Sequence, residues 1–140
     1  MRLPRNASGW TMAVFGVLAL VMGVVGLVAP DVLLAALGFT RVADRPPGDY
    51  TRTFLAASSM ASLNMGVYYL VAVATSWRPF YLFTVAFRLL TFTVFTILVL
   101  AEVAPTRFLG VAIWEGVGAV ATGVALWSER GSVVSVPSNP

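Results

Sequence analysis

The sequence predicts an all-α, polytopic membrane protein: a bundle of four transmembrane helices with a short interfacial helix after the first span. The chain is 59% hydrophobic and only 11% charged, whereas a soluble domain carries roughly 25% charged residues. Since a span needs about 20 apolar residues, a chain of 140 residues holds four spans and little else. We therefore expect one transmembrane domain over residues 1–130 and a disordered tail over residues 131–140.

Charge and residue types exclude several classes of function. The net charge is +3, but all basic residues are arginines scattered beside apolar runs, which is typical of headgroup anchors and not of a nucleic-acid site. The chain has no Cys and no His. Disulfides, thiolate zinc sites and histidine-ligated haem are therefore excluded, and we expect neither a metal site nor a cofactor.

The first span is predicted at about residues 10–28, and it is longer than the apolar core of a signal peptide. Gly9, Gly16 and Gly23 recur at intervals of seven and form a stripe of small residues. Such stripes let helix backbones approach closely in lipid. We expect this face to pack on another helix of the chain or, in a homodimer, on a second copy.

A short helix is predicted at about residues 31–38, because Pro30 ends the first span and Gly38 offers a C-terminal stop. Asp31 is the expected N-cap. This segment is too short to cross a bilayer, so we expect it to lie at the interface. A polar loop over residues 40–52, with two prolines in sequence, leads to the second span.

Three further spans are predicted at about residues 54–75, 80–100 and 108–127. Aromatic side chains lie near the expected ends of the spans and would form interfacial belts: Trp10, Tyr50, Trp77, Tyr81 and Trp127. Glu102 and Glu129 are also expected at interfaces.

Topology follows from the arginines. Their count is equal on the two sides of a four-span model, but Arg2 and Arg5 precede the first helix, which usually dominates insertion. We therefore expect a multi-pass protein of the cell (plasma) membrane, the inner membrane in a bacterium, with both termini cytoplasmic.

Three polar residues fall inside the predicted spans: Asn64 in the second, Arg88 in the third and Glu115 in the fourth. A lone charge at the bilayer centre costs at least about 2.5 to 3.5 kcal/mol. Because the third and fourth spans form a hairpin, we expect Arg88 and Glu115 to pair. At 1.5 Å per residue, Asn64 is expected at a similar depth.

This layer predicts a site for a lipophilic small molecule, such as a quinone or a lipid, or a contact with a membrane-protein partner for which the chain is an accessory subunit. Phe83, Phe87 and Trp114 would add apolar walls. An equally simple interpretation is that the ion pair only sets helix register. The expected binding residues are Asn64, Tyr68, Thr84, Arg88, Thr91, Trp114 and Glu115.

The alternative is a membrane-embedded isomerase or cyclase acting on an isoprenoid or polyketide. Glu115 would then be the general acid or base, and Arg88 would tune it or stabilise developing negative charge. Transport is less favoured, because the spans hold one acid and no relay of ionisable groups.

The order of elements also resembles a known family. A Gly-rich first span, the segment PDVLLAALG from Pro30 to Gly38, a polar loop, and a second span containing Gly66 are similar to the DoxX-like superfamily of small four-helix membrane proteins. The resemblance covers about residues 10–127 and implies the architecture. The best-known members look like membrane subunits that accompany redox enzymes, with quinone nearby, and no family motif assigns a catalytic residue here.

Overall fold

The computed structural model describes residues 4, 6–40, 42 and 44–131, and every regular element in that part is a helix. The elements are α1 (Ala7–Val28), α2 (Pro30–Ala36), α3 (Thr51–Ala74), α4 (Arg78–Leu100), the 3₁₀ turn η1 (Thr106–Phe108) and α5 (Leu109–Gly131). Of the predicted tail, Gly131 ends α5, and the remaining residues lie outside the described part.

Four helices are long and apolar enough to cross a membrane. They are α1, α3, α4 and α5, and each extends over nearly all of one predicted span. The prediction of an all-helical chain with four candidate spans is therefore confirmed. The main differences are at the ends of the helices, where polar side chains add residues that hydropathy does not count; Asn6, for example, accepts a hydrogen bond from the backbone N–H of Gly9 at 3.1 Å and so caps α1.

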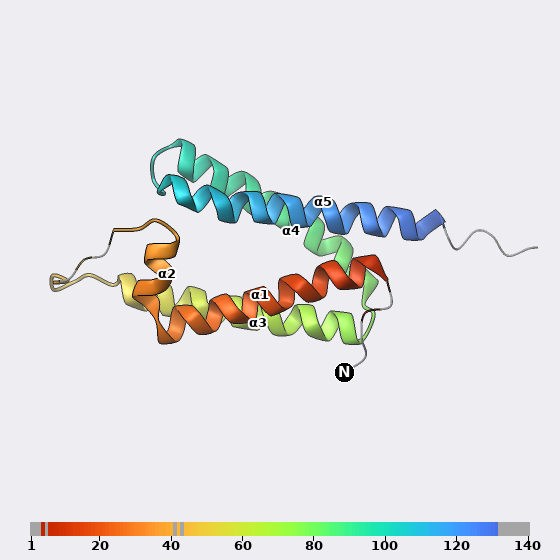
Figure 1. Ribbon diagram of the computed structural model, residues 1–140, viewed down its shortest axis with the longest axis horizontal. Helices are drawn as coiled ribbons and strands as arrows, with labels where there is room; N and C mark the ends of the chain where they lie inside the picture. Colours follow the sequence, from red (N-terminus) through yellow and green to blue (C-terminus); the bar gives the residue numbers. More distant parts are fainter. Residues whose placement is uncertain (1–3, 5, 41, 43, 132–140) are drawn as a thin grey trace, which may run out of the picture.

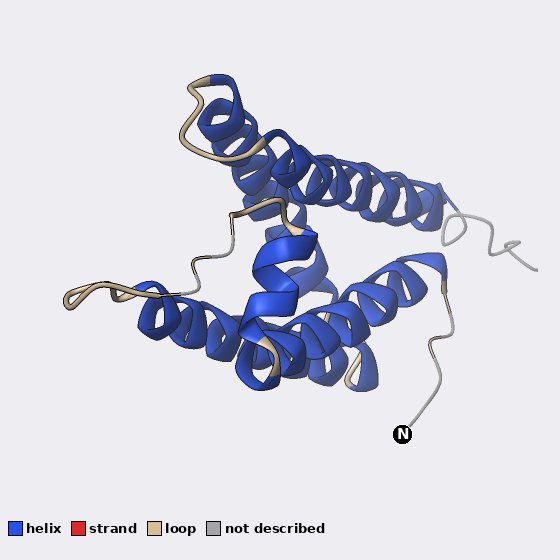
Figure 2. Ribbon diagram, turned by 60° about the vertical axis from the view of Figure 1, so that its left-hand side comes forward, coloured by secondary structure: helices blue, strands red, loops and turns tan. Residues whose placement is uncertain are grey.

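The helices form two antiparallel pairs, α1 with α3 and α4 with α5 (Figure 1). The pairs meet mainly through α1 and α5, and they lie closest at the end where α1 begins and α5 ends. At the other end α2 stands between the pairs (Figure 2). There a Cβ on Gly38 would lie 2.8 Å from Cβ of Arg107 on η1, and the rings of Phe39 and Phe108 are 6.0 Å apart.

Glycines bring the backbones of α1 and α3 together. A Cβ on Gly23 would lie 2.8 Å from the carbonyl oxygen of Ser59, and one on Gly66 would lie 2.8 Å from that of Gly16. No larger side chain fits such a contact without movement. The predicted stripe does pack on another helix, and because α3 covers Gly16 and Gly23, that face is not free for a second copy.

The short helix α2 ends as predicted but begins differently. Gly38 has φ +88°, and the N–H of Phe39 bonds to the carbonyl of Leu34 at 2.9 Å, which is the Schellman arrangement. Asp31 is not the N-cap. It lies in the first turn of α2, and its carboxylate accepts a hydrogen bond from Arg52 at 3.0 Å instead.

Aromatic side chains near the helix ends divide into two groups. Trp10, Tyr50, Trp77 and Trp127 are all more than half exposed, as interfacial anchors would be. Tyr81 is the exception, because it is only 3% exposed and its hydroxyl donates to the carbonyl of Ala72 at 3.3 Å. Tyr81 thus lies near a helix end, as predicted, but its hydroxyl is satisfied by a neighbouring helix end and not by water.

Candidate functional site

An ion pair joins α4 and α5 near the middle of the bundle. Nε of Arg88 lies 3.2 Å from Oε2 of Glu115, and the side chains are 3% and 23% exposed, respectively. The hairpin of α4 and α5 places the two residues at matching depth. The predicted pairing of these two charges is therefore confirmed.

Helical spacing sets the surroundings of this pair. On α4, Tyr81, Thr84 and Arg88 share the buried face, as residues three and four apart must. On α5, the buried residues at this spacing around Glu115 are small: Ala112, Gly118, Ala119 and Thr122. The small side chains leave room for the long side chain of Arg88.

Two aromatic rings from the other helix pair enclose the guanidinium. Cζ of Arg88 lies 3.0 Å from the centroid of the Phe15 ring on α1 and 5.6 Å from that of Tyr69 on α3. Aromatic faces attract cations, and more strongly where water is excluded. All four long helices therefore contribute to the environment of Arg88.

Gly118 makes this arrangement possible. A Cβ at that position would overlap the ring of Phe15 and would lie 2.7 Å from Nη1 of Arg88. Any side chain here would displace the ring, the guanidinium or both. Gly118 therefore marks the point where α5 passes directly over the charged centre.

The guanidinium of Arg88 is buried beside the Glu115 carboxylate and the Tyr69 ring. Among the described residues, none accepts a hydrogen bond from Nε, Nη1 or Nη2, all of which are buried. Glu115 offers charge compensation at Nε, but not with hydrogen-bond geometry. An Arg side chain carries five N–H donors, and buried donors are nearly always satisfied. The centre therefore has buried donors whose hydrogen bonds the described residues do not satisfy.

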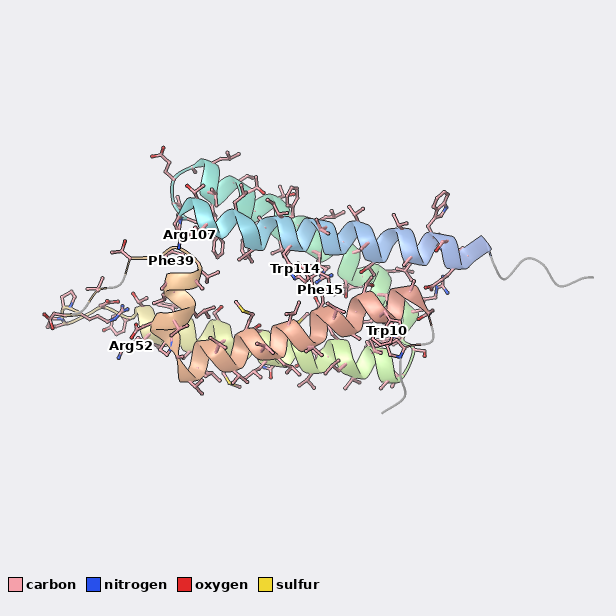
Figure 3. All side chains as sticks on the ribbon, in the orientation of Figure 1. Trp10, Phe15, Phe39, Arg52, Arg107 and Trp114 are labelled. Atoms are coloured by element: carbon pink, nitrogen blue, oxygen red, sulfur yellow. The ribbon has the colours of Figure 1, made fainter. Side chains whose placement is uncertain are left out.

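An apolar groove of about 310 Å³ lies beside this centre, between α1 and α5. Its lining includes Trp10, Val14, Phe15, Trp114 and Gly118. Figure 3 shows Phe15 and Trp114 pointing toward each other from the two helices, with their ring centroids 4.6 Å apart. Because Phe15 and Gly118 both line the groove and contact Arg88, they form the floor that separates it from the guanidinium.

Two predicted site residues lie elsewhere. Asn64 is exposed and Tyr68 is 54% exposed, both on the outer face of α3. The inner face of α3 is set by Ser59, Gly66 and Tyr69, which are buried. Residues 64 and 66 differ by about 200° around a helix, so Asn64 faces away from Arg88. The prediction that Asn64 lies in one layer with Arg88 and Glu115 is therefore wrong.

The remaining predicted residues have mixed positions. Thr84 is buried, but its hydroxyl donates to the carbonyl of Phe80 at 2.8 Å. Thr91 likewise donates to the carbonyl of Phe87 at 3.0 Å. Trp114 lines the groove. Phe83 and Phe87, expected as walls, are 57% and 52% exposed and face outward.

The expected binding residues did not include Phe15, Tyr69 or Gly118. Phe15 directly precedes a glycine of the α1 stripe, and Tyr69 follows Gly66 by three residues, so both lie on or next to packing faces. Gly118 lies three residues after Glu115. The sequence signal for Gly118 was its position among small residues beside an intramembrane charge.

A second polar cluster lies where α1 begins and α5 ends. Glu129 accepts hydrogen bonds from the backbone N–H of Ser8 at 2.9 Å, from its hydroxyl at 2.9 Å and from Asn6 at 3.3 Å. Nη1 of Arg78 lies 3.7 Å from the same carboxylate. Glu129 thus binds the first turn of α1, where unpaired N–H groups attract an anion.

At the opposite end, Asp49 orders the start of α3. Its carboxylate accepts from the hydroxyl and backbone N–H of Thr51 and from Arg45, which is 2.8 Å away. These contacts lower the pKa of Asp49 to about 2, the hydrogen bonds from Thr51 contributing most.

No family model, curated protein or solved structure matches this chain. Among the described residues, no group of three carboxylates comes together that could hold a metal ion. The Arg88 centre and the adjoining groove together form the candidate site of this chain.

Proposed function

We propose that the chain is a multi-pass membrane protein that binds a lipophilic small molecule between α1 and α5, with an oxygen atom of its head group hydrogen-bonded to Arg88. One observation carries the proposal: a guanidinium that is 3% exposed has no hydrogen-bond acceptor among the described residues, directly behind an apolar groove. An unsatisfied buried donor favours a ligand that satisfies it.

The two parts of the site fit two parts of such a molecule. Apolar walls between two helices that would both face lipid suit a hydrocarbon chain or a flat ring. The free Nη1 and Nη2 groups suit a carbonyl or ester oxygen. A quinone or a glycerolipid has both parts, and we propose this class of ligand.

Phe15 would act as the barrier between the two parts. Its ring lies over the guanidinium at 3.0 Å and also lines the groove. A head group can reach Arg88 in two ways. Either the Phe15 ring rotates into the groove, or the head group passes over Gly118, where α5 has no side chain. Binding would thus exchange a cation–π contact for hydrogen bonds.

A second function, an isomerase or cyclase of isoprenoids or polyketides, is favoured by the partial exposure of Glu115. Its side chain is 23% exposed and has one charged neighbour, so it could exchange a proton with a bound molecule. A Glu115→Gln variant distinguishes the functions, because it retains a polar group for binding but cannot act as an acid or base. Turnover that disappears while binding persists would favour the enzyme.

The setting of the protein is part of the proposal. The start of α1 and the end of α5 lie at one end of the bundle, the end of Glu129 and Arg78 (Figure 1), and we propose that this end is cytoplasmic and the membrane is the cell membrane. We also propose a relation to the DoxX-like superfamily, for which the order of elements speaks, including the short α2 that is followed by Gly38; a role as an accessory subunit is what that resemblance would imply.

The test measures binding of a benzoquinone with a decyl chain to the purified protein in lipid nanodiscs. Trp10 and Trp114 line the groove, so bound quinone should quench tryptophan fluorescence. The double variant Arg88→Met/Glu115→Leu removes the donor without leaving an unpaired charge. Hydrogen bonds to charged groups contribute about 1.5 to 3 kcal/mol, so we expect its affinity to fall roughly 10- to 100-fold.

Phe87→Leu is the matched control, because Phe87 precedes Arg88 on α4 but is 52% exposed. Its affinity should equal that of the unmodified protein. Native mass spectrometry of the same samples should show a co-purified lipid or quinone that the double variant loses. Equal affinity of the double variant and the control, with no co-purified molecule in either, would contradict the proposal.

A further inference from the structure

Asn64 is a polar residue without a polar contact near the middle of a helix that is apolar enough to span a membrane. It lies 13 residues after the first residue of α3 and 10 before the last. Its side chain is exposed, and no hydrogen bond joins it to any described residue. A primary amide facing hydrocarbon is unfavourable by several kcal/mol unless it is paired.

Asn64 belongs to a regular row of exposed residues on α3. Counting from Ala57 in steps of four and three gives Ala61, Asn64, Tyr68, Val71 and Thr75, and every one of them is exposed. Alternating steps of four and three residues are the spacing by which one helix packs along another in a left-handed crossing. We call these six residues the α3 row.

The described helices leave the row uncovered, since all six residues are exposed. The opposite face of α3, with Ser59, Gly66 and Tyr69, packs on α1. Figures 1 and 2 show α3 at the edge of the molecule, with the α4–α5 pair beyond α1. The α3 row therefore faces the surroundings of the bundle, away from the groove between α1 and α5.

We propose that the α3 row is the interface of a two-fold dimer, with Asn64 paired to Asn64 of a second copy. An amide carries both a donor and an acceptor, so two identical amides across a two-fold axis satisfy each other. Two copies inserted in the same orientation run their α3 helices in parallel, which brings residue 64 against residue 64. Ala57 and Ala61 are small enough for the backbones to approach on one side of this pair.

A lipid tail does not fit this surface equally well, because it offers no hydrogen-bond partner to the amide. Gly16 and Gly23 of α1, which belong to another small-residue face, are already covered by α3. The inference is independent of the proposed ligand, since the row and the groove lie on different faces. A dimer could therefore form whether or not the groove binds a quinone or lipid.

Cysteine cross-linking tests the interface directly, because the chain has no cysteine of its own. Ala57→Cys lies in the row. Ser58→Cys is its matched control, since it is equally small, exposed and at nearly the same depth, but about 100° around the helix. In native membranes with mild oxidant, we expect a disulfide-linked dimer for Ala57→Cys and Ala61→Cys and at least about fivefold less for Ser58→Cys.

Replacement of the amide tests its role. In the Ala57→Cys background, Asn64→Leu should weaken dimerisation roughly 3- to 20-fold, the range given by interhelical hydrogen bonds in membranes. Asn64→Gln, which keeps an amide, should retain most of the cross-linking.

Three results would overturn the dimer: equal cross-linking at residues 57 and 58, an unchanged yield with Asn64→Leu, or a cross-linked product whose mass shows a different protein as the partner. Dilution of the protein in lipid separates association from random collision. As the ratio of lipid to protein rises, the cross-linked fraction of Ala57→Cys should fall only at a much higher ratio than that of Ser58→Cys. If both fractions fall at the same ratio, the proposal is contradicted.

Discussion

Two carboxylates on α5, Glu115 and Glu129, have opposite hydrogen-bonding situations. Glu129 accepts from the backbone and hydroxyl of Ser8 and from Asn6, so both oxygens are used. Glu115 lies beside Arg88, whose nitrogens have no acceptor among the described residues. We call the Glu129 cluster complete, because both carboxylate oxygens are hydrogen-bonded, and the Arg88–Glu115 cluster incomplete. A complete polar cluster stabilises the fold, whereas an incomplete one has hydrogen-bonding groups that can bind a further partner.

The two clusters are about 21 Å apart along the helix, at 1.5 Å per residue. Sites this distant that share no partner have nearly additive effects on stability. The effect of a substitution at one cluster on stability can therefore be interpreted without correction for the other cluster. Variants of each cluster test the comparison.

The largest effect is expected when the incomplete cluster loses one charge. Glu115→Gln leaves Arg88 buried without charge compensation and should lower the free energy of unfolding by about 3 kcal/mol. The double variant Arg88→Met/Glu115→Leu removes both charges and should be about as stable as the unmodified protein. Unfolding in mixed micelles, followed by circular dichroism, measures both. A double variant as unstable as Glu115→Gln would mean that the pair itself stabilises the bundle.

A smaller loss is expected from filling the space at the incomplete cluster. Gly118→Ala places a Cβ against Phe15 and Arg88 and should destabilise the bundle by about 1 to 3 kcal/mol. Gly123→Ala is the control, because its Cβ would meet only Val85 at 3.7 Å. We expect Gly118→Ala to weaken quinone binding and Gly123→Ala to leave stability and binding unchanged. Equal effects of the two alanines would show that the centre tolerates added volume.

At the complete cluster we expect a change in stability without a change in binding. Glu129→Ala leaves the first turn of α1 without its acceptor and should reduce the free energy of unfolding by about 1 to 2 kcal/mol. Decylquinone quenching should be unaffected. The same micelle and fluorescence assays apply, and a loss of quinone affinity would remove the distinction between the two clusters.

The smallest effect concerns Asp49, an acid in the loop that precedes α3. Its pKa is lowered to about 2 in the folded chain, below the usual 3.8, so the folded state favours the charged form. Its contribution is complete above about pH 4 and declines as the pH falls through the folded value. Hydrogen exchange at the start of α3 should therefore be constant from pH 7 to about pH 4 after correction for the intrinsic rate. Below about pH 4 the protection of these amides should decline, and Asp49→Asn should remove this decline. If the decline persists in the variant, another group causes it.

Much of the architecture could be predicted from sequence because hydropathy and chain connectivity control it. Long apolar runs separated by Pro, Gly and Arg give four helices of spanning length. The pairing of Arg88 with Glu115 followed because a hairpin of consecutive helices fixes their relative depth. Each of these features depends on distance along the chain, which the sequence states directly.

Only the tertiary structure decided which way α3 faces and which aromatic rings meet the guanidinium of Arg88. In a soluble helix a polar stripe marks the outer side, but helices that are apolar all round carry little such signal. Asn64 was therefore placed inward when it faces outward, and Phe15 and Tyr69, whose rings enclose Arg88, were not identified. Rotation is set by backbone contact between Gly23 of α1 and Ser59 of α3, a close fit between segments far apart in the sequence, which no local pattern specifies.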